Sequence, residues 1–177
     1  VCKNQRIHIH KVFKGIAQRG KCSMGWFFGF KLHLICNEKG ELLNFMITPG
    51  DIDDRKPLDY KAFIDLIYGK LFGDKGYISK NLFQRLFVDG IQLITKLKSN
   101  MKGALISVSD RLLLRKRAII ETVNDELKNI AQVEHSRHRC FDNFIVNLLG
   151  AIAAYCLFPK KPCINVQRTI DTQLALF

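Results

Sequence analysis

The first 37 residues of the chain contain no aspartate or glutamate, although they hold seven lysines and arginines. Nothing in this stretch neutralises its positive charge, and such a segment is typical of proteins that bind a polyanion. The sequence also has only four prolines, no internal repeat and no linker rich in proline, glycine or serine, while 47% of its residues are hydrophobic. These features exclude a disordered or low-complexity chain. We expect one folded domain of 177 residues.

Metal-binding cysteine pairs and long apolar runs are absent as well. None of the six cysteines is spaced Cys-x-x-Cys, so a zinc ribbon is disfavoured, and His8, His10 and His33 make only a weak zinc motif. The longest apolar run, residues 144–158, is about 15 residues long, shorter than the roughly 20 that cross a bilayer. We expect a buried helix there, no membrane partner and a reduced, cytoplasmic setting.

The positive charge that is present is unevenly distributed. The net charge is +12, yet residues 38–74 hold eight acids against five bases. Residues 96–117 then hold seven bases and a single acid, Asp110. Two basic segments on either side of an acidic middle favour binding to a nucleic-acid backbone, although a solvated basic surface would show the same pattern.

The spacing of apolar residues predicts a mixed α/β fold. Alternation over residues 26–48, with turn residues at 37–40, predicts a β-hairpin that is broken at Thr48-Pro49-Gly50. Strands are also expected at 70–73 and 91–95, and helices at 57–68, 81–88, 112–131 and 141–157. A strand, helix and strand within about 30 residues predict a parallel crossover. Asp74 would then lie at the carboxyl end of a strand, where α/β sheets collect functional groups.

The helix expected at 112–131 has one polar face and one apolar face. Arg117, Glu121, Asn124 and Lys128 fall in a single polar stripe. The apolar face that should pack on the sheet is formed by Ile119, Ile120, Val123, Leu127 and Ile130. The simplest interpretation of the stripe is a solvated face with an Arg117–Glu121 pair. With Asp74 as a second carboxylate among many cations, the alternative is a Mg²⁺ site that cuts phosphodiesters.

These motifs resemble the catalytic domain of bacterial insertion-sequence transposases of the DDE type. Arg117, Glu121 and Lys128 reproduce the family spacing R-x3-E-x6-K around the catalytic glutamate. The other matching segments are Lys31-Leu32-His33-Leu34 with Thr48-Pro49-Gly50, Gly73-Asp74-Lys75-Gly76-Tyr77, and the hydrophobic helix at 144–158. The resemblance spans about residues 25–158 and implies an RNase H-like fold, in which an antiparallel hairpin is followed by parallel strands flanked by helices.

The resemblance also implies roles for individual residues. Asp74 and Glu121, with one further aspartate, would bind two Mg²⁺ (or Mn²⁺) ions. Arg117 and Lys128 would hold DNA phosphates, and the loop residues Lys96, Lys98 and Lys102 would add further DNA contacts. The implied partners are transposon ends and target DNA, the implied location is the bacterial cytoplasm at the nucleoid, and a homo-oligomer is compatible with the family.

Two positions depart from the family pattern. The family has a tyrosine three residues before the arginine, and this chain has Leu114. Family members carry their first catalytic aspartate on the first strand of the fold, and residues 1–37 supply none. We therefore expect that aspartate, and any N-terminal DNA-binding domain, to lie before Val1. Residues 1–177 would then be a DDE catalytic domain without its first strand and with impaired activity.

Other interpretations remain open at the level of the sequence. Asp51, Asp53 and Asp54 could replace the missing aspartate, but they are more simply interpreted as caps at a helix start or as solvated loop charges. The chain could be a non-catalytic DNA-binding remnant or regulator. It could also be an RNase H-like nuclease that cuts without joining.

Overall fold

A computed structural model describes residues 2–3, 9, 11–22, 25–96, 106–133, 138–164 and 174–176. The chain divides into two compact units. The first consists of Val1–His33, Met46–Asp53 and Asn124–Pro159, and the second of Leu34–Phe45, Asp54–Val123 and Lys160–Phe177. Each unit is therefore built from segments that are distant in the sequence.

The predicted hairpin is confirmed as strands β3 (Gly25–Asn37) and β4 (Leu42–Pro49). Its turn closes because the Gly40 N–H donates to the Asn37 carbonyl at 3.0 Å, and the Asn37 side chain accepts from the Lys39 and Glu41 N–H groups. Gly40 has a φ of 70°, a left-handed conformation that glycine adopts without strain. The strand ends at Pro49, as the Thr48-Pro49-Gly50 break predicts.

The first unit adds two strands that the sequence pattern did not predict. Strands β1 (Cys2–Lys3) and β2 (Gln18–Cys22) both pair antiparallel with the first half of β3. Helix α5 (Phe141–Cys156) confirms the helix predicted at 141–157. The prediction that this helix is buried is wrong, because only Leu148, Ala151, Ile152 and Tyr155 are buried, whereas Val146 and Leu149 are exposed. Four rings pack together with centroids 5.4 to 6.4 Å apart, those of Phe13, Phe30, Phe141 and Phe144. This aromatic cluster joins α5 to the strand region within the unit.

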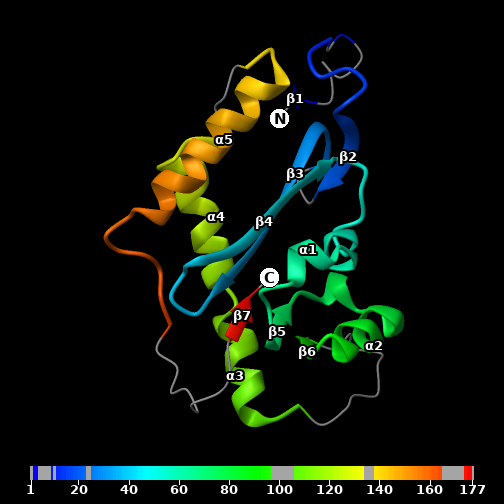
Figure 1. Cartoon of the computed structure of the whole chain (residues 1–177), viewed down its shortest axis with the longest axis vertical. Helices are drawn as coiled ribbons and strands as arrows, with labels where there is room; N and C mark the ends of the chain where they lie inside the picture. The colour runs from blue at the N-terminus through cyan, green and yellow to red at the C-terminus, as the bar shows by residue number, and fades with distance from the viewer. Residues whose placement is uncertain are drawn as a thin grey trace. The chain divides into compact units, whose positions relative to one another are not determined.

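The second unit contains the predicted crossover. Strand β5 (Gly69–Gly73), helix α2 (Lys80–Val88) and strand β6 (Ile91–Thr95) follow one another, and β5 pairs parallel with β6 (Figure 1). Leu71 and Phe72 are fully buried on β5, and α2 packs on β6. A short strand, β7 (Leu174–Leu176), pairs antiparallel with the end of β3 and parallel with β5. The result is the mixed α/β architecture that the sequence predicts.

The prediction of one helix over residues 57–68 is wrong, because the helical structure there is shorter and interrupted. The structure has a 3₁₀ turn, η2 (Lys56–Asp59), and a short helix, α1 (Lys61–Ile64), separated by Tyr60 in an extended conformation. The amide of Asn44 donates to the carbonyls of Ala62 and Phe63 at 3.1 Å each. Because these carbonyls accept from a side chain, α1 ends where the apolar pattern alone would have continued it.

The helix predicted at 112–131 is two helices, α3 (Val108–Lys116) and α4 (Ile119–Asn129). At the junction, the Ile120 and Glu121 N–H groups donate to carbonyls three residues back, at 3.1 and 3.0 Å, so the chain tightens locally to 3₁₀ geometry. The predicted apolar face is confirmed by four buried side chains, those of Ile119, Ile120, Val123 and Leu127. Ile130 was wrongly included, because it is 61% exposed beyond the end of α4.

None of the helices in the described part of the chain has the length and apolar character needed to cross a membrane.

Cys36 on β3 is fully buried, and burial raises the pKa of its thiol to about 12. The thiol therefore stays neutral and packs as a small hydrophobic group.

Candidate active site around Asp74 and Arg117

Asp74 follows β5 directly and begins a 3₁₀ turn, η3 (Lys75–Tyr77). Its Oδ1 accepts from the Lys75 N–H at 2.7 Å, which fixes the carboxylate at the end of the strand. A Cβ on Gly73 would lie 3.4 Å from the Tyr77 ring, so this ring packs directly on the Gly73 backbone. The side chain of Asp74 is nevertheless 59% exposed. The turn thus holds an accessible carboxylate on a buried, rigid strand.

Arg117 is the cation that the structure brings to Asp74. Its Nη2 lies 3.6 Å from Asp74 Oδ1, and the Arg117 side chain is only 18% exposed. Arg117 caps the carboxyl end of α3, where its N–H donates to the Leu113 carbonyl at 3.0 Å. Because α3 ends at Lys116 and α4 begins only at Ile119, Arg117 does not continue the polar stripe of α4. The pair that the sequence suggested, Arg117 with Glu121, is absent from the described residues, where Arg117 pairs with Asp74.

Glu121 lies in the first turn of α4, and its side chain is exposed. A carboxylate at this position interacts favourably with the positive end of the helix dipole. Lys128 lies in the last turn of the same helix, in the segment that belongs to the first compact unit. The two residues are seven positions apart and so share one face of α4.

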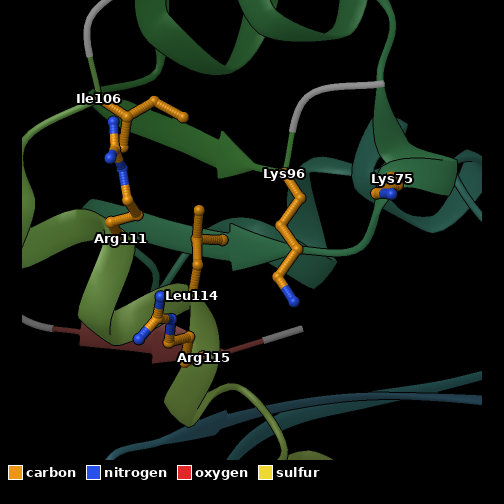
Figure 2. A pocket seen from close by; sticks show the side chains of 6 residues that line it. All are labelled: Lys75, Lys96, Ile106, Arg111, Leu114 and Arg115. Atoms are coloured by element: carbon orange, nitrogen blue, oxygen red, sulfur yellow. The ribbon is translucent and has the colours of Figure 1, made fainter. Parts of the chain in front are cut away.

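Of the predicted loop cations, the structure describes Lys96 alone; Lys98 and Lys102 lie outside the described residues. Lys96 follows β6 and lines a pocket of about 380 Å³ in the second unit. In Figure 2, Leu114 of α3 lies between the arginines of that helix and the lysines. The lining residues are Lys75, Lys96, Ile106, Arg111, Leu114 and Arg115. Leu114, which departs from the family's tyrosine, is 3% exposed and forms part of the pocket wall.

Other candidates from the sequence have structural explanations. Nε2 of His33 lies 2.8 Å from Thr48 Oγ1 in a buried hydrogen bond across the hairpin. Asp51, Asp53 and Asp54 are all exposed. The residue at the N-cap of η2 is Arg55, and its side chain makes no capping hydrogen bond. The three aspartates lie in the loop before this turn, and none of them is its N-cap residue.

The donor chemistry of Asp74 and Glu121 fits a hard divalent cation. Both offer carboxylate oxygens, which Mg²⁺ prefers, and Mg²⁺ commonly uses one or two carboxylates while keeping several waters. Both side chains are exposed, and one oxygen of Asp74 is oriented by the Lys75 N–H. Within the described ranges, however, no three His, Cys, Asp or Glu side chains gather into a group that could hold a metal ion. The described residues thus offer carboxylate oxygens of the kind that Mg²⁺ binds, without a complete set of ligands.

Reasoning from the sequence did not assign a site role to Lys75, Arg111 or Arg115. The excess of cations between residues 96 and 117 was the available signal for the two arginines. Lys75 could have been noted because it adjoins Asp74 in the sequence.

A comparison with protein families identifies the family of the chain. The family model described as "Transposase DDE domain" matches residues 1–141, which include Asp74, Arg117, Glu121 and Lys128. No curated protein and no solved structure gives a significant match. The α/β arrangement, with its antiparallel hairpin and parallel strands flanked by helices, is consistent with an RNase H-like DDE domain. The chain belongs to the transposase DDE domain family.

Proposed function

We propose that this chain is the catalytic domain of an insertion-sequence transposase that cuts DNA strands and transfers them to target DNA. The observation that carries the proposal is the family match over both signature segments, together with Asp74 at the carboxyl end of β5 and Arg117 3.6 Å from its carboxylate. An exposed carboxylate beside a mostly shielded arginine suits a site that receives a phosphodiester.

Asp74 and Glu121 are the proposed ligands of two Mg²⁺ (or Mn²⁺) ions, since DDE transposases generally use divalent metals. When bound, such ions lower the pKa of water and neutralise charge that develops at phosphorus. Arg117 positions the Asp74 carboxylate and offsets its charge when DNA is bound. Lys128, Lys96, Lys98 and Lys102 are proposed to contact the DNA backbone.

A complete site of this kind needs a third carboxylate. The described residues contain no group of three, and residues 1–37 include no acid. We propose that the missing aspartate is encoded upstream of Val1 and that residues 1–177 form one catalytic domain without its first strand. This chain alone should then bind DNA but not cleave it. The proposed setting is the bacterial cytoplasm, with transposon ends and target DNA as partners and a homo-oligomer as the working form.

The test is a strand-cleavage and joining assay with Mg²⁺ or Mn²⁺ on the chain extended by its upstream coding sequence. Asp74→Asn and Glu121→Gln should each lower the cleavage rate by about 10³-fold, because several kcal/mol of charge stabilisation are lost. Asp89→Asn, which removes an exposed carboxylate at the end of α2, should leave the rate unchanged. Cleavage by Glu121→Gln at the unmodified rate would refute the assignment.

Two alternatives give different results in the same assay. If the chain is a non-catalytic DNA-binding remnant, the unmodified chain and the Asp74→Asn variant would bind DNA equally well, and the extended chain would not cut it. An RNase H-like nuclease would cut but form no joined product. Metal-dependent nicking by the 177-residue chain itself would show that no further ligand is needed.

A further inference from the structure

The pocket between α3, η3 and the end of β6 is lined by four cations and no acid. Lys75 comes from η3, Lys96 follows β6, and Arg111 and Arg115 come from α3. All four side chains are exposed. Arg111 and Arg115 are one helical turn apart, so they present their guanidinium groups on the same face of α3. Ile106 and Leu114 supply the apolar part of the wall.

The charge of this pocket is not neutralised by its neighbours. Asp110, the one acid of α3, is 8% exposed, and its Oδ1 accepts from Lys70 Nζ at 2.7 Å, on β5. Within the part of the chain that the structure describes, no carboxylate pairs with any of the four pocket cations. Like charges one turn apart on a helix destabilise it by about 0.2–0.5 kcal/mol. An anion in the pocket would remove this repulsion.

The chemistry of the lining favours phosphate groups. Arginine presents a planar fork that binds two phosphate oxygens at once, and lysine adds a mobile point charge. The apolar wall of Ile106 and Leu114 offers a surface for a sugar between phosphates. Lys75 is the residue next to Asp74, and its N–H donates to the Asp74 carboxylate. An anion held by Lys75 is therefore close to the candidate catalytic aspartate.

We propose that this pocket is a subsite for the DNA backbone, in which Lys75, Lys96, Arg111 and Arg115 hold the phosphates that flank the position of cleavage. The assignment of DNA as the occupant rests on the proposed function. The subsite adds three residues to the proposed DNA contacts: Lys75 of η3, and Arg111 and Arg115 of α3.

The test measures the salt dependence of binding between the 177-residue chain and a short fluorescein-labelled DNA duplex, by fluorescence anisotropy. The variant Arg111→Gln with Arg115→Gln should reduce the slope of log K against log salt by about 2, because each lost phosphate contact reduces it by about 0.9. Lys96→Gln should reduce it by about 1, in a separate variant that tests the opposite wall. The charge-preserving variant Arg111→Lys with Arg115→Lys should retain the unmodified slope.

The matched control is Lys61→Gln with Lys80→Gln. It removes the same charge from exposed sites on α1 and α2, outside the pocket, and its slope should stay within about 0.5 of the unmodified chain. The proposal is overturned if the pocket variant and this control have equal slopes. It is also overturned if the chain binds an RNA duplex more tightly than DNA and the pocket variant weakens only the binding of RNA. A third contradicting result is that the pocket variant weakens the binding of a nucleoside triphosphate but not of DNA.

Failure of the subsite and failure of the proposed function can be distinguished. If the pocket variant has the reduced slope but cleavage by the extended chain ignores Asp74→Asn, the subsite stands and the catalytic assignment falls. If Asp74→Asn abolishes cleavage but the pocket variant keeps the unmodified slope, the subsite falls and the catalytic assignment stands.

Discussion

Two groups of cations in the second unit have different surroundings. In the paired group, Lys70 contacts Asp110 at 2.7 Å, while Lys56, at 3.1 Å, and Arg85 both contact Asp59. In the pocket group, Lys75, Lys96, Arg111 and Arg115 line one cavity without a carboxylate. The paired group ties elements together, since Lys70 joins β5 to α3 and Arg85 joins α2 to η2. The pocket group makes no such ion pair between described elements.

Arg117 is intermediate between these groups. It lies 3.6 Å from Asp74, a longer separation than the other pairs with stated distances, and is mostly shielded from solvent. Its partner is the candidate catalytic carboxylate and not a structural acid. The comparison teaches that net charge alone does not identify a binding surface. A binding surface is better indicated by the cations that make no ion pair with a carboxylate of the fold.

The largest stability effect should come from breaking the shielded pair of the paired group. Asp110→Ala should lower the free energy of unfolding by about 2 kcal/mol, because it leaves the Lys70 ammonium without its partner and removes an acid from the first turn of α3. Urea unfolding measures the loss. The double variant Lys70→Met with Asp110→Leu should recover part of it. A loss below about 0.5 kcal/mol would mean that the pair is not structural.

A charge reversal inside the pocket should separate binding from stability. Arg115→Glu places a carboxylate among the pocket cations, so affinity for a DNA duplex should fall by about tenfold or more, close to 1.4 kcal/mol. The free energy of unfolding should stay the same or rise by up to about 0.5 kcal/mol, because new ion pairs form. Anisotropy and urea unfolding measure the two quantities. Unchanged DNA affinity would show that the pocket group does not bind the backbone.

The Asp59 pairs should give a smaller, pH-dependent effect. Burial alone would raise the pKa of Asp59, but the hydrogen bonds and charges of Lys56 and Arg85 outweigh it and lower the pKa below its usual value. The stabilisation is therefore present above the unfolded pKa of about 3.9 and is lost as the pH falls through the folded value. Asp59→Asn should cost about 0.5 kcal/mol near neutral pH and nothing below the folded pKa. A cost that is constant with pH would contradict this account.

The smallest effect should come from neutralising the pocket arginines. Arg111→Gln with Arg115→Gln should change the free energy of unfolding by no more than about 0.5 kcal/mol, and in the stabilising direction if repulsion dominates. Thermal and urea unfolding give the value. A destabilisation comparable to that of Asp110→Ala would show that these arginines hold the fold, and the distinction between the two groups would disappear.

The sequence predicted those parts of the fold that depend on local patterns. Period-2 alternation located β3 and β4, and the strand, helix and strand around Asp74 followed from short apolar runs with turn residues between them. Strands β2 and β7 were missed because their pairing partners are set by the tertiary fold. The end of α1 depends on the Asn44 side chain, which reaches it from β4, so no local pattern could indicate it.

The candidate site was only partly predictable for the same reason. The position of Asp74 followed from the predicted strand end. Glu121 was expected in the middle of one long helix, and the structure places it in the first turn of α4. The partner of Arg117 could not be predicted. Helical spacing favoured a pair with Glu121, but α3 ends before Arg117, and the Arg117 side chain pairs with Asp74. The pocket cations were visible as charges in the sequence. Only the burial of Asp110 against Lys70 shows that this acid does not neutralise them.

The central claim is that Asp74 and Glu121 bind the same metal ions. The most direct measurement is Mn²⁺ binding to the 177-residue chain, followed by electron paramagnetic resonance in a double-mutant cycle. If the two carboxylates share a site, Asp74→Asn and Glu121→Gln should each weaken binding by about tenfold or more, and the double variant should lose little beyond either single variant. Asp89→Asn should have no effect. Losses that add fully in the double variant, or Mn²⁺ binding that ignores both substitutions, would contradict the account.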